Sequence, residues 1–435
     1  MDTQRRLRTF YTLVITQALS LLGGYLSSFA VSVWIYTETG DATPIALTAF
    51  FGFVPRALLY SFAGAFVDRL DRRLVMALSD TGQAIATLLL YISLITGTFQ
   101  LWHLYAVVFA QSLFQIFQGP AYTASITLLV PDTHRERANA LRTLSTSIAQ
   151  ALAPSLGGLL YGLIGVEGAM FIDFATFIIA MAALLFLRIP RPEQTHIGRN
   201  FSGSFWGQVL GGFRFMWLYR PLLVLILYIG TMNLLFSGIL SITIPYVFAR
   251  LTNTTQTGIV LSIYGLGAIG GSLFMLAWGG LHPRVRVIVP GMALIGILLI
   301  GIGISQNAIT LSLFLFLVMF IFALSSSAIT SLLQAKVPPD VQGRVFAAMA
   351  QVSQLLTIVG YLLVGPLADT VFEPAVNMPF WQNFALLVGD SAGAGIGLMF
   401  VFSGLLIFVS SVLIYRWPTI RYMERDLPDY ATATG

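Results

Sequence analysis

Two charged residues lie deep within apolar sequence and could do chemistry there, Arg56 and Asp80. Only 9% of the 435 residues are charged, and ionisable residues inside a membrane are costly enough to be functional candidates. Arg56 stands twelve residues before Asp68, which is ~18 Å along a helix. Asp80, seven residues after Arg73, is expected ~10 Å from the same face on the next, antiparallel helix. We predict an Arg56–Asp80 ion pair whose carboxylate could exchange a proton.

A purely structural role for the same residues stays open. Arg56 and Asp80 could form a fixed internal ion pair that stabilises the helices without carrying protons. Asp173 is a further candidate for proton coupling, although its position near the end of an apolar run also fits a helix cap or a side chain that snorkels to the interface.

Several other kinds of chemistry have no support in the sequence. There is no cysteine, and the four histidines are scattered without metal-ligand spacing. No P-loop occurs. GLGAIG at 265–270 imitates a dinucleotide fingerprint, but it lies inside an apolar run without a preceding strand, which favours packing glycines. We therefore expect no enzyme activity, no cofactor and no metal, and any transport would be driven by an ion gradient or run downhill.

Hydropathy defines the elements that must hold these residues. With 57% hydrophobic residues, the composition is that of a membrane protein. Apolar runs long enough to cross a hydrocarbon core of ~30 Å recur along the chain, and they must be helices because lipid satisfies no backbone polar groups. We predict an all-α protein with twelve transmembrane helices at 10–36, 44–67, 74–97, 103–128, 141–165, 168–187, 221–248, 257–279, 287–305, 309–333, 345–370 and 394–415.

Basic residues predict the orientation. With twelve spans, all of the 23 Lys and Arg residues except Arg56 and Arg250 fall on the side that holds both termini. The positive-inside rule then places both ends in the cytoplasm of a plasma (inner) membrane protein. The basic residues are spread over separate loops without stacking aromatic residues, so nucleic-acid binding is not expected.

The chain also shows signs of an internal duplication. Shifted by 207 residues, VPDTHRER at 130–137 aligns with VPPDVQGR at 337–344. We predict two pseudo-symmetric six-helix bundles, 1–187 and 221–415. A cytoplasmic linker at 188–220, which ends in an amphipathic stretch, joins them, and a cytoplasmic tail at 416–435 follows.

At this level the sequence resembles the major facilitator superfamily over nearly its whole length. GAFVDRLDRR at 64–73 matches the family pattern G-x-x-x-D-R-x-x-R-[RK], with Asp71 where the family more often has Gly. The fifth predicted helix resembles the antiporter motif of exporters at Ala153, Pro154, Gly157 and Gly158. RANALRTLSTSIAQ and the tail RYMERDLPDY look most like the branch of macrolide-efflux proteins and siderophore exporters.

The resemblance implies a cytoplasmic gate, which we call the latch. Its expected members are Gly64, Asp68, Arg69, Arg72, Arg73 and Arg344. Gly64 permits close helix approach, and a carboxylate at position 68 would be stabilised by the positive N-terminal end of the eleventh helix, after Arg344. Alternatively, Arg72 and Arg73 have no gating role and are basic only because cytoplasmic loops are rich in Lys and Arg.

The resemblance also implies a solvent-filled cavity between helices 1, 4, 7 and 10. Candidate polar residues on these helices are Gln17, Tyr25, Gln111, Gln115, Gln118, Asn233, Ser325 and Ser326. The three glutamines of helix 4 share one face, so interhelical hydrogen bonding is an equal alternative. These four helices lack acidic residues, which favours large, weakly charged or amphipathic substrates over strongly cationic ones.

These patterns predict a proton-coupled antiporter that exports hydrophobic or amphipathic small molecules by alternating access. An exporter of an endogenous metabolite such as a siderophore is one alternative, and a membrane receptor or scaffold that transports nothing is another. The expected partners are a small-molecule substrate, protons and the lipid bilayer, with the protein acting as a monomer.

Overall fold

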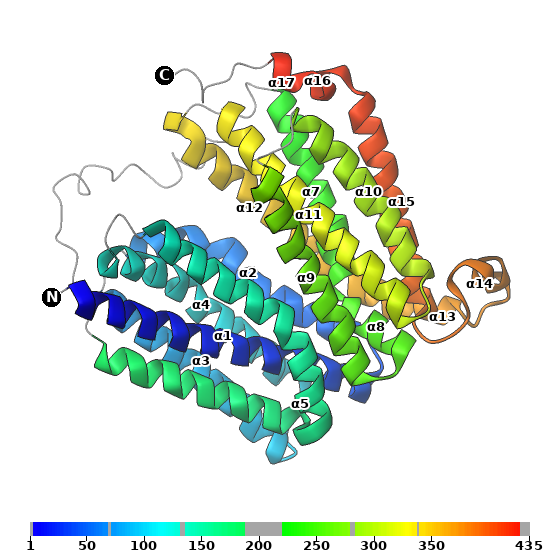
Figure 1. Cartoon of the computed structure of the whole chain (residues 1–435). Coiled ribbons are helices and arrows are strands. Elements are labelled where there is room, and N and C mark those ends of the chain that lie inside the picture. Colours follow the sequence, from blue (N-terminus) through cyan, green and yellow to red (C-terminus); the bar gives the residue numbers. More distant parts are fainter. Residues whose placement is uncertain are drawn as a thin grey trace. The chain divides into compact units, whose positions relative to one another are not determined.

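The computed structural model describes residues 3–67, 71–130, 135–187, 220–278, 283–336 and 339–426. Within these ranges the chain is helical and contains no strand (Figure 1). All twelve predicted apolar segments coincide with helix in the described residues. By length and composition, nine of the described helices could cross a membrane. The predicted all-α membrane fold is therefore confirmed.

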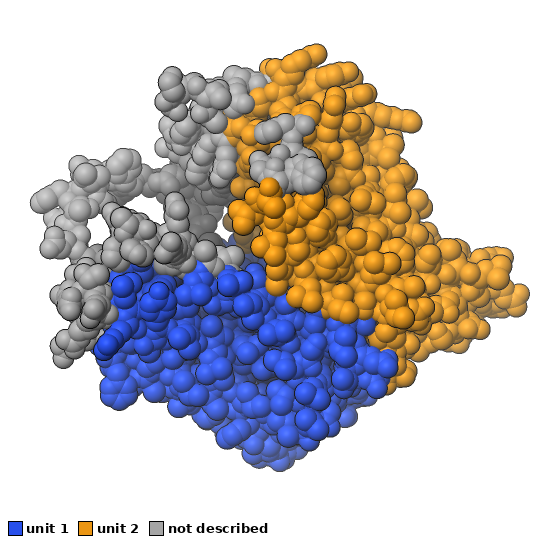
Figure 2. All heavy atoms as spheres, viewed as in Figure 1, with its two compact units in different colours: residues 1–195, 253–262 blue, residues 196–252, 263–435 orange. Residues whose placement is uncertain are grey.

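Contacts divide the chain into two units, coloured separately in Figure 2. Unit 1 comprises residues 1–195 and 253–262, and unit 2 comprises residues 196–252 and 263–435. All but the last residue of the predicted linker at 188–220, and the end of the tail at 427–435, lie outside the described residues.

Unit 1 is built from five long helices, in which α1 and α3 pack against α5 and α4 packs against both α2 and α3. Their bounds are α1 Thr3–Thr39, α2 Thr43–Val67, α3 Arg72–Ile95, α4 Leu101–Leu129 and α5 Arg135–Phe186. Element α5 holds two of the predicted spans. Its backbone is non-helical at Gly165, where φ is 71° and ψ is −175°, a conformation for which glycine has no Cβ penalty.

Unit 2 contains the remaining long helices, which pair as α7 with α12, α10 with α15 and α10 with α11. Their bounds are α7 Arg220–Ser241, α8 Thr243–Leu251, α9 Thr254–Trp278, α10 Val285–Ile304, α11 Ala308–Lys336, α12 Pro339–Leu367 and α15 Ala394–Arg416. The first residues of α9, up to residue 262, count with unit 1. Helices α10 and α15 cross closely at Gly296. A Cβ added at this residue would lie only 2.6 Å from the Gly404 carbonyl oxygen. Small residues permit such packing where lipid offers no hydrophobic driving force.

Short elements that the sequence did not predict follow α12 and α15. After α12 come a π-helical turn (η3, Ala368–Phe372), α13 (Glu373–Ala375), a 3₁₀ turn (η4, Pro379–Trp381) and α14 (Gln382–Val388). After α15 come α16 (Pro418–Arg421) and α17 (Met423–Asp426). Trp381 and Val388 of the segment between α12 and α15 form an apolar cluster with Leu398 of α15.

Candidate functional site

Helix α3 presents a polar stripe to the interior of unit 1. Asp80, Gln83 and Thr87 follow one another at spacings of three and four residues, so they lie on one face of the helix. All three are buried, and Asp80 is 0% exposed. The other buried stretches of α3 are largely apolar, so these polar groups need partners on neighbouring helices.

Side-chain amides surround the Asp80 carboxylate. Gln17 of α1 donates from Nε2 to Asp80 Oδ2 at 2.9 Å, and Gln118 of α4 donates to Asp80 Oδ1. Gln118 also donates to Gln17 Oε1 at 3.0 Å and accepts from Gln83 Nε2 at 2.8 Å. We call Gln17, Asp80, Gln83 and Gln118 the amide network. Within the described part of the chain, no cation contacts this carboxylate.

The predicted Arg56–Asp80 ion pair is wrong in this structure. Arg56 on α2 is exposed and donates from Nη2 to Gln115 Oε1 on α4 at 2.8 Å. The reason is helix packing: α2 lies against α4, whereas the Asp80 side chain is enclosed by residues of α1, α3 and α4. Arg56 and Asp80 were predicted to pair because helix rise puts them at similar depths in the membrane, but their side chains lie on surfaces that do not face each other.

Asp173 provides a second buried carboxyl group in unit 1. It is 3% exposed and lies inside α5, away from a helix end, so the expectation that it caps a helix or snorkels to the interface is wrong. Thr87 donates to its Oδ2 at 3.4 Å and in turn accepts from Gln111 Nε2 at 2.9 Å. Asp173 Oδ1 is buried without a hydrogen-bond partner among the described residues. Asp173 thus adjoins the polar stripe of α3, to which Asp80 belongs.

The glutamines of α4 serve interhelical bonding, which was one of the two predicted alternatives. Gln111 reaches α3, Gln115 reaches Arg56 on α2, and Gln118 reaches both α1 and α3. Gln115 nevertheless remains exposed. Tyr25 of α1 accepts a hydrogen bond from Gln150 Nε2 at 2.9 Å.

Arg73 of the latch and the neighbouring Asp71 have local structural roles at the start of α3. Asp71 is the N-cap of α3, and its carboxylate accepts a hydrogen bond from the Arg73 backbone N–H at 3.0 Å. Arg73 Nε donates to the Leu184 carbonyl oxygen at 2.8 Å, and its Nη2 donates to the Leu185 carbonyl. A cation at the carbonyl end of α5 complements the helix dipole.

The remaining residues of the latch are Gly64, Asp68, Arg69, Arg72 and Arg344. Arg72 is partly buried. Asp68 and Arg69 lie outside the described residues, and Gly64 and Arg344 are helical positions whose surroundings are not described. The predicted gate contacts stay predictions.

The exporter-like motif of α5 packs against α1. Ala153 is buried, Pro154 lies inside the helix, and Gly157 faces α1. A Cβ at Gly157 would lie 3.0 Å from Phe29 Cδ1 and 3.1 Å from the Leu26 carbonyl oxygen. A Cβ at Gly158 would lie 2.8 Å from the Thr254 carbonyl oxygen at the start of α9 and 3.5 Å from the Phe29 ring. The small residues of this motif therefore permit α5 to approach both α1 and the first residues of α9 closely.

Unit 2 contains a pocket of about 200 Å³ formed by α7, α10, α11, α12 and α15. Two predicted cavity residues line it, Asn233 and Ser326. Ser325, the third candidate in this half, is fully buried and does not line it. The sequence did not reveal Met232, Met292, Met349 and Ser353 as lining residues, since residues on separate helices carry no spacing signal that brings them to one pocket.

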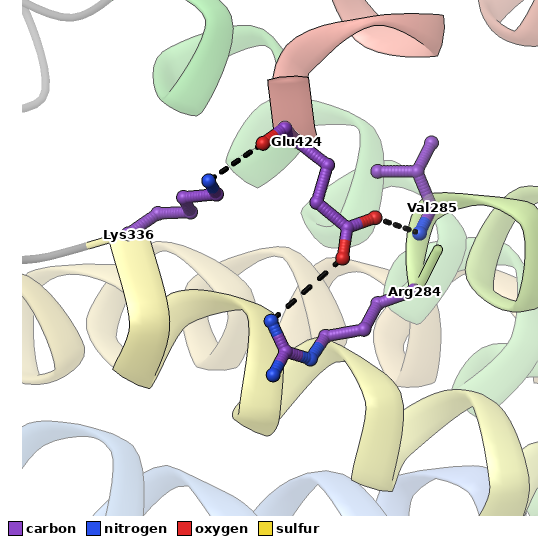
Figure 3. A network of polar contacts seen from close by, with 4 residues as sticks. All are labelled: Arg284, Val285, Lys336 and Glu424. Carbon is purple, nitrogen blue, oxygen red and sulfur yellow. Dashed lines mark hydrogen bonds and ion pairs between the residues drawn. The ribbon is translucent and has the colours of Figure 1, made fainter. Parts of the chain in front are cut away.

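A polar cluster in the tail was also missed. Glu424 of α17 accepts from the Val285 backbone N–H at the start of α10 at 3.2 Å and pairs with Arg284 at 3.7 Å. Lys336, the last residue of α11, donates to the Glu424 carbonyl oxygen at 2.6 Å. Figure 3 shows these four residues, which we call the tail clasp.

Buried carboxyl groups within apolar helices are typical of the ion and substrate pathways of membrane transporters. The family model described as Major Facilitator Superfamily matches residues 13–361, and the chain belongs to this superfamily of secondary transporters. The predicted family is confirmed.

Relatives of known name support this assignment. The chain is 26% identical over 383 residues to Macrolide efflux protein A of Streptococcus pyogenes, covering 87% of this chain and 93% of that protein. It is 21% identical over 367 residues to Multidrug efflux pump Tap of Mycolicibacterium fortuitum, covering 82% of this chain and 88% of that pump. The predicted resemblance to macrolide-efflux proteins is thereby confirmed.

Solved structures agree on the fold. An inward-facing, unoccupied bacterial homologue of the human lysosomal transporter Spinster superposes with a TM-score of 0.75 at 14% identity, covering 98% of this chain and 99% of that one. The nucleoside transporter NupG superposes with a TM-score of 0.72 at 13% identity, covering 94% and 99%.

Proposed function

We propose that this protein is a proton-coupled antiporter that exports hydrophobic or amphipathic small molecules by alternating access. The proposal on substrates follows the named relatives, which include macrolide and multidrug efflux proteins. The concentration of basic residues on one side of the predicted topology supports a location in the inner membrane with both termini in the cytoplasm.

The observation that carries proton coupling is the burial of Asp80 among amides. A charged carboxylate taken out of water is costly unless a cation or a proton neutralises it. No cation contacts Asp80 among the described residues, whereas Gln17 and Gln118 can hydrogen-bond either protonation state after a rotation of their amides. Asp80 therefore fits a group that takes up and releases a proton when its access to water changes.

Asp173 is the second proposed proton site. Its carboxyl group adjoins the same face of α3 through Thr87. Its Oδ1 has no hydrogen-bond partner among the described residues. A proton bound to this oxygen could therefore be donated to an acceptor that comes within hydrogen-bond distance. The Asp80 site has two donors fixed on it, so we assign the primary role to Asp80. Arg56 keeps no direct role, because its contact is with Gln115.

Transport in proteoliposomes tests the coupling. Inside-acid vesicles should accumulate radiolabelled erythromycin, and nigericin should abolish the accumulation. Asp80→Asn should lose this accumulation but retain exchange of labelled for unlabelled substrate, because exchange needs no net proton movement. Asp390→Asn, at an exposed carboxylate, is the control and should behave like the wild type.

Two results would count against the proposal. If wild-type vesicles accumulated equal amounts of erythromycin with and without the pH gradient, proton antiport would be excluded. Full gradient-driven accumulation by Asp80→Asn would show that another group carries the proton, and Asp173→Asn is then the next variant to measure.

The latch stays part of the proposal as a cytoplasmic gate. The contacts of Asp71 and Arg73 support this role because they hold the start of α3 in place, and the motif of residues 64–73 ends there. Asp68→Asn should therefore impair efflux of a hydrophobic dye, and unchanged efflux would remove the latch from the mechanism.

A further inference from the structure

The pocket of unit 2 has an apolar floor and a polar rim. Its floor includes Met232, Met292, Ile295 and Ile407, each less than a tenth exposed. Ser326, at the rim, is exposed. The floor therefore offers a polarizable surface that adapts to varied apolar shapes, as methionine does at promiscuous sites.

Aromatic rings form one wall of this pocket. Phe236 of α7 and Phe322 of α11 are stacked with centroids 5.0 Å apart and an interplanar angle of 21°, and both line the pocket. Such faces favour an aromatic or flat apolar group on the ligand.

Two polar groups lie side by side in the same pocket. Asn233 Nδ2 donates to the Ile229 carbonyl oxygen at 3.0 Å and to Ser353 Oγ at 2.7 Å. Both amide hydrogens are thus used, which leaves Asn233 Oδ1 as an acceptor and the Ser353 hydroxyl hydrogen as a donor. A ligand group that both donates and accepts, such as a hydroxyl or an amide, matches this pair.

Charge and size narrow the ligand further. None of the described residues that line the pocket is charged, so an ion entering it would be desolvated without a counter-charge. The volume is about 200 Å³, and an engineered apolar cavity of ~150 Å³ is known to hold benzene. A single ring with a small polar substituent fits, but a molecule as large as a macrolide does not.

We propose that this pocket is a subsite that binds one neutral, ring-sized apolar arm of an exported molecule, with a hydroxyl or amide on that arm held by Asn233 and Ser353. The proposal rests on the export function proposed above and names the part of the substrate that this half of the protein selects. Substrates that share such an arm would then compete with one another, whatever the rest of their structure.

The absence of cysteine from the sequence makes a direct binding test possible. Ser326→Cys places a single thiol at the pocket rim, and Ser327→Cys places one at the next position, which is also exposed but does not line the pocket. In purified protein without any gradient, benzyl alcohol should slow N-ethylmaleimide labelling at position 326 and leave labelling at position 327 unchanged.

Chemical and structural controls refine the test. Benzylamine and benzoate, which carry charges at neutral pH, should protect much less than benzyl alcohol. In the Ser326→Cys background, Ser353→Ala and Asn233→Leu should each weaken protection by benzyl alcohol about fivefold, the effect of one neutral hydrogen bond, while protection by toluene should persist.

The outcomes separate this proposal from proton-coupled export. Equal protection at both positions, or none at saturating benzyl alcohol, would overturn the subsite even if transport is proton-coupled. Protection confined to position 326 would support the subsite even if Asp80→Asn transports normally, because the labelling requires no transport.

Discussion

Gln17 donates a hydrogen bond to Asp80 at 2.9 Å, which ties helix α1 to the buried carboxyl group of α3. Gln118 of α4 completes the contact by bonding to both residues. Three helices of unit 1 therefore meet at one carboxyl group, and the amide of Gln118 has the most partners in the network.

Replacement of Gln118 by leucine should destabilise unit 1. It removes the donor to Asp80 Oδ1 and takes from Gln83 Nε2 one of two acceptors, the other being the Ser79 carbonyl oxygen. An unsatisfied buried polar group costs about 1–3 kcal/mol. Thermal unfolding in detergent should show a lower midpoint. Gln382→Leu, at an exposed position of α14, is the control, and equal midpoints for the two variants would show that the network contributes no stability.

Replacement of Arg56 by methionine should leave proton coupling intact. Arg56 contacts Gln115 and is exposed, so its loss removes one interhelical bond without altering the partners of Asp80. The ratio of protons released to substrate taken up by proteoliposomes should match the wild type. A ratio that falls as far as in Asp80→Asn would restore the ion-pair hypothesis that the structure contradicts.

Two glycines of α5 offer a matched comparison of packing. Gly157→Leu should disrupt the α1–α5 contact, because even a Cβ there is crowded by Phe29 and by the Leu26 backbone. Gly162→Leu should be tolerated or stabilising, since a Cβ at Gly162 meets nothing within 4 Å and leucine favours helix by about 0.8 kcal/mol over glycine. Yield of monodisperse protein and the unfolding midpoint measure both. Similar values for the two variants would contradict a packing role for the motif.

Loss of the Glu424 carboxylate should loosen the tail clasp. Glu424→Ala removes the acceptor of the Val285 N–H and the partner of Arg284, with an expected cost of about 1–2 kcal/mol. Asp426→Ala is the control, because Asp426 pairs with the neighbouring, exposed Arg425. Limited proteolysis should cleave α16 and α17 faster in Glu424→Ala than in the wild type, and at the wild-type rate in Asp426→Ala. Equal cleavage rates in the two variants would show that the clasp does not hold the tail.

The helices and the family could be predicted from the sequence because both depend on local patterns. Apolar runs of sufficient length can only be helices in lipid, and the order of short motifs indicates the superfamily. The reversal at Gly165 is also implied, since two predicted spans abut there, although hydropathy does not reveal its positive φ.

Side-chain partners could not be predicted in the same way. The rise of a helix gives the depth of Arg56 and Asp80, but the direction in which each side chain points depends on which helices pack together. The pocket could not be predicted for the same reason. Met232, Met292 and Ile407 come from three helices, and sequence periodicity does not determine how each helix is rotated relative to the others. Asp71 departs from the family pattern, but that departure alone does not reveal that it caps α3.

The tail clasp has a practical consequence for anyone who shortens or extends this polypeptide. A chain terminated at Tyr422 would lack Glu424 and would deprive Lys336, which is 4% exposed, of the carbonyl oxygen it now bonds. Purification tags and fluorescent fusions therefore belong beyond residue 426, where they leave the end of α11 and the start of α10 fastened as in the native protein.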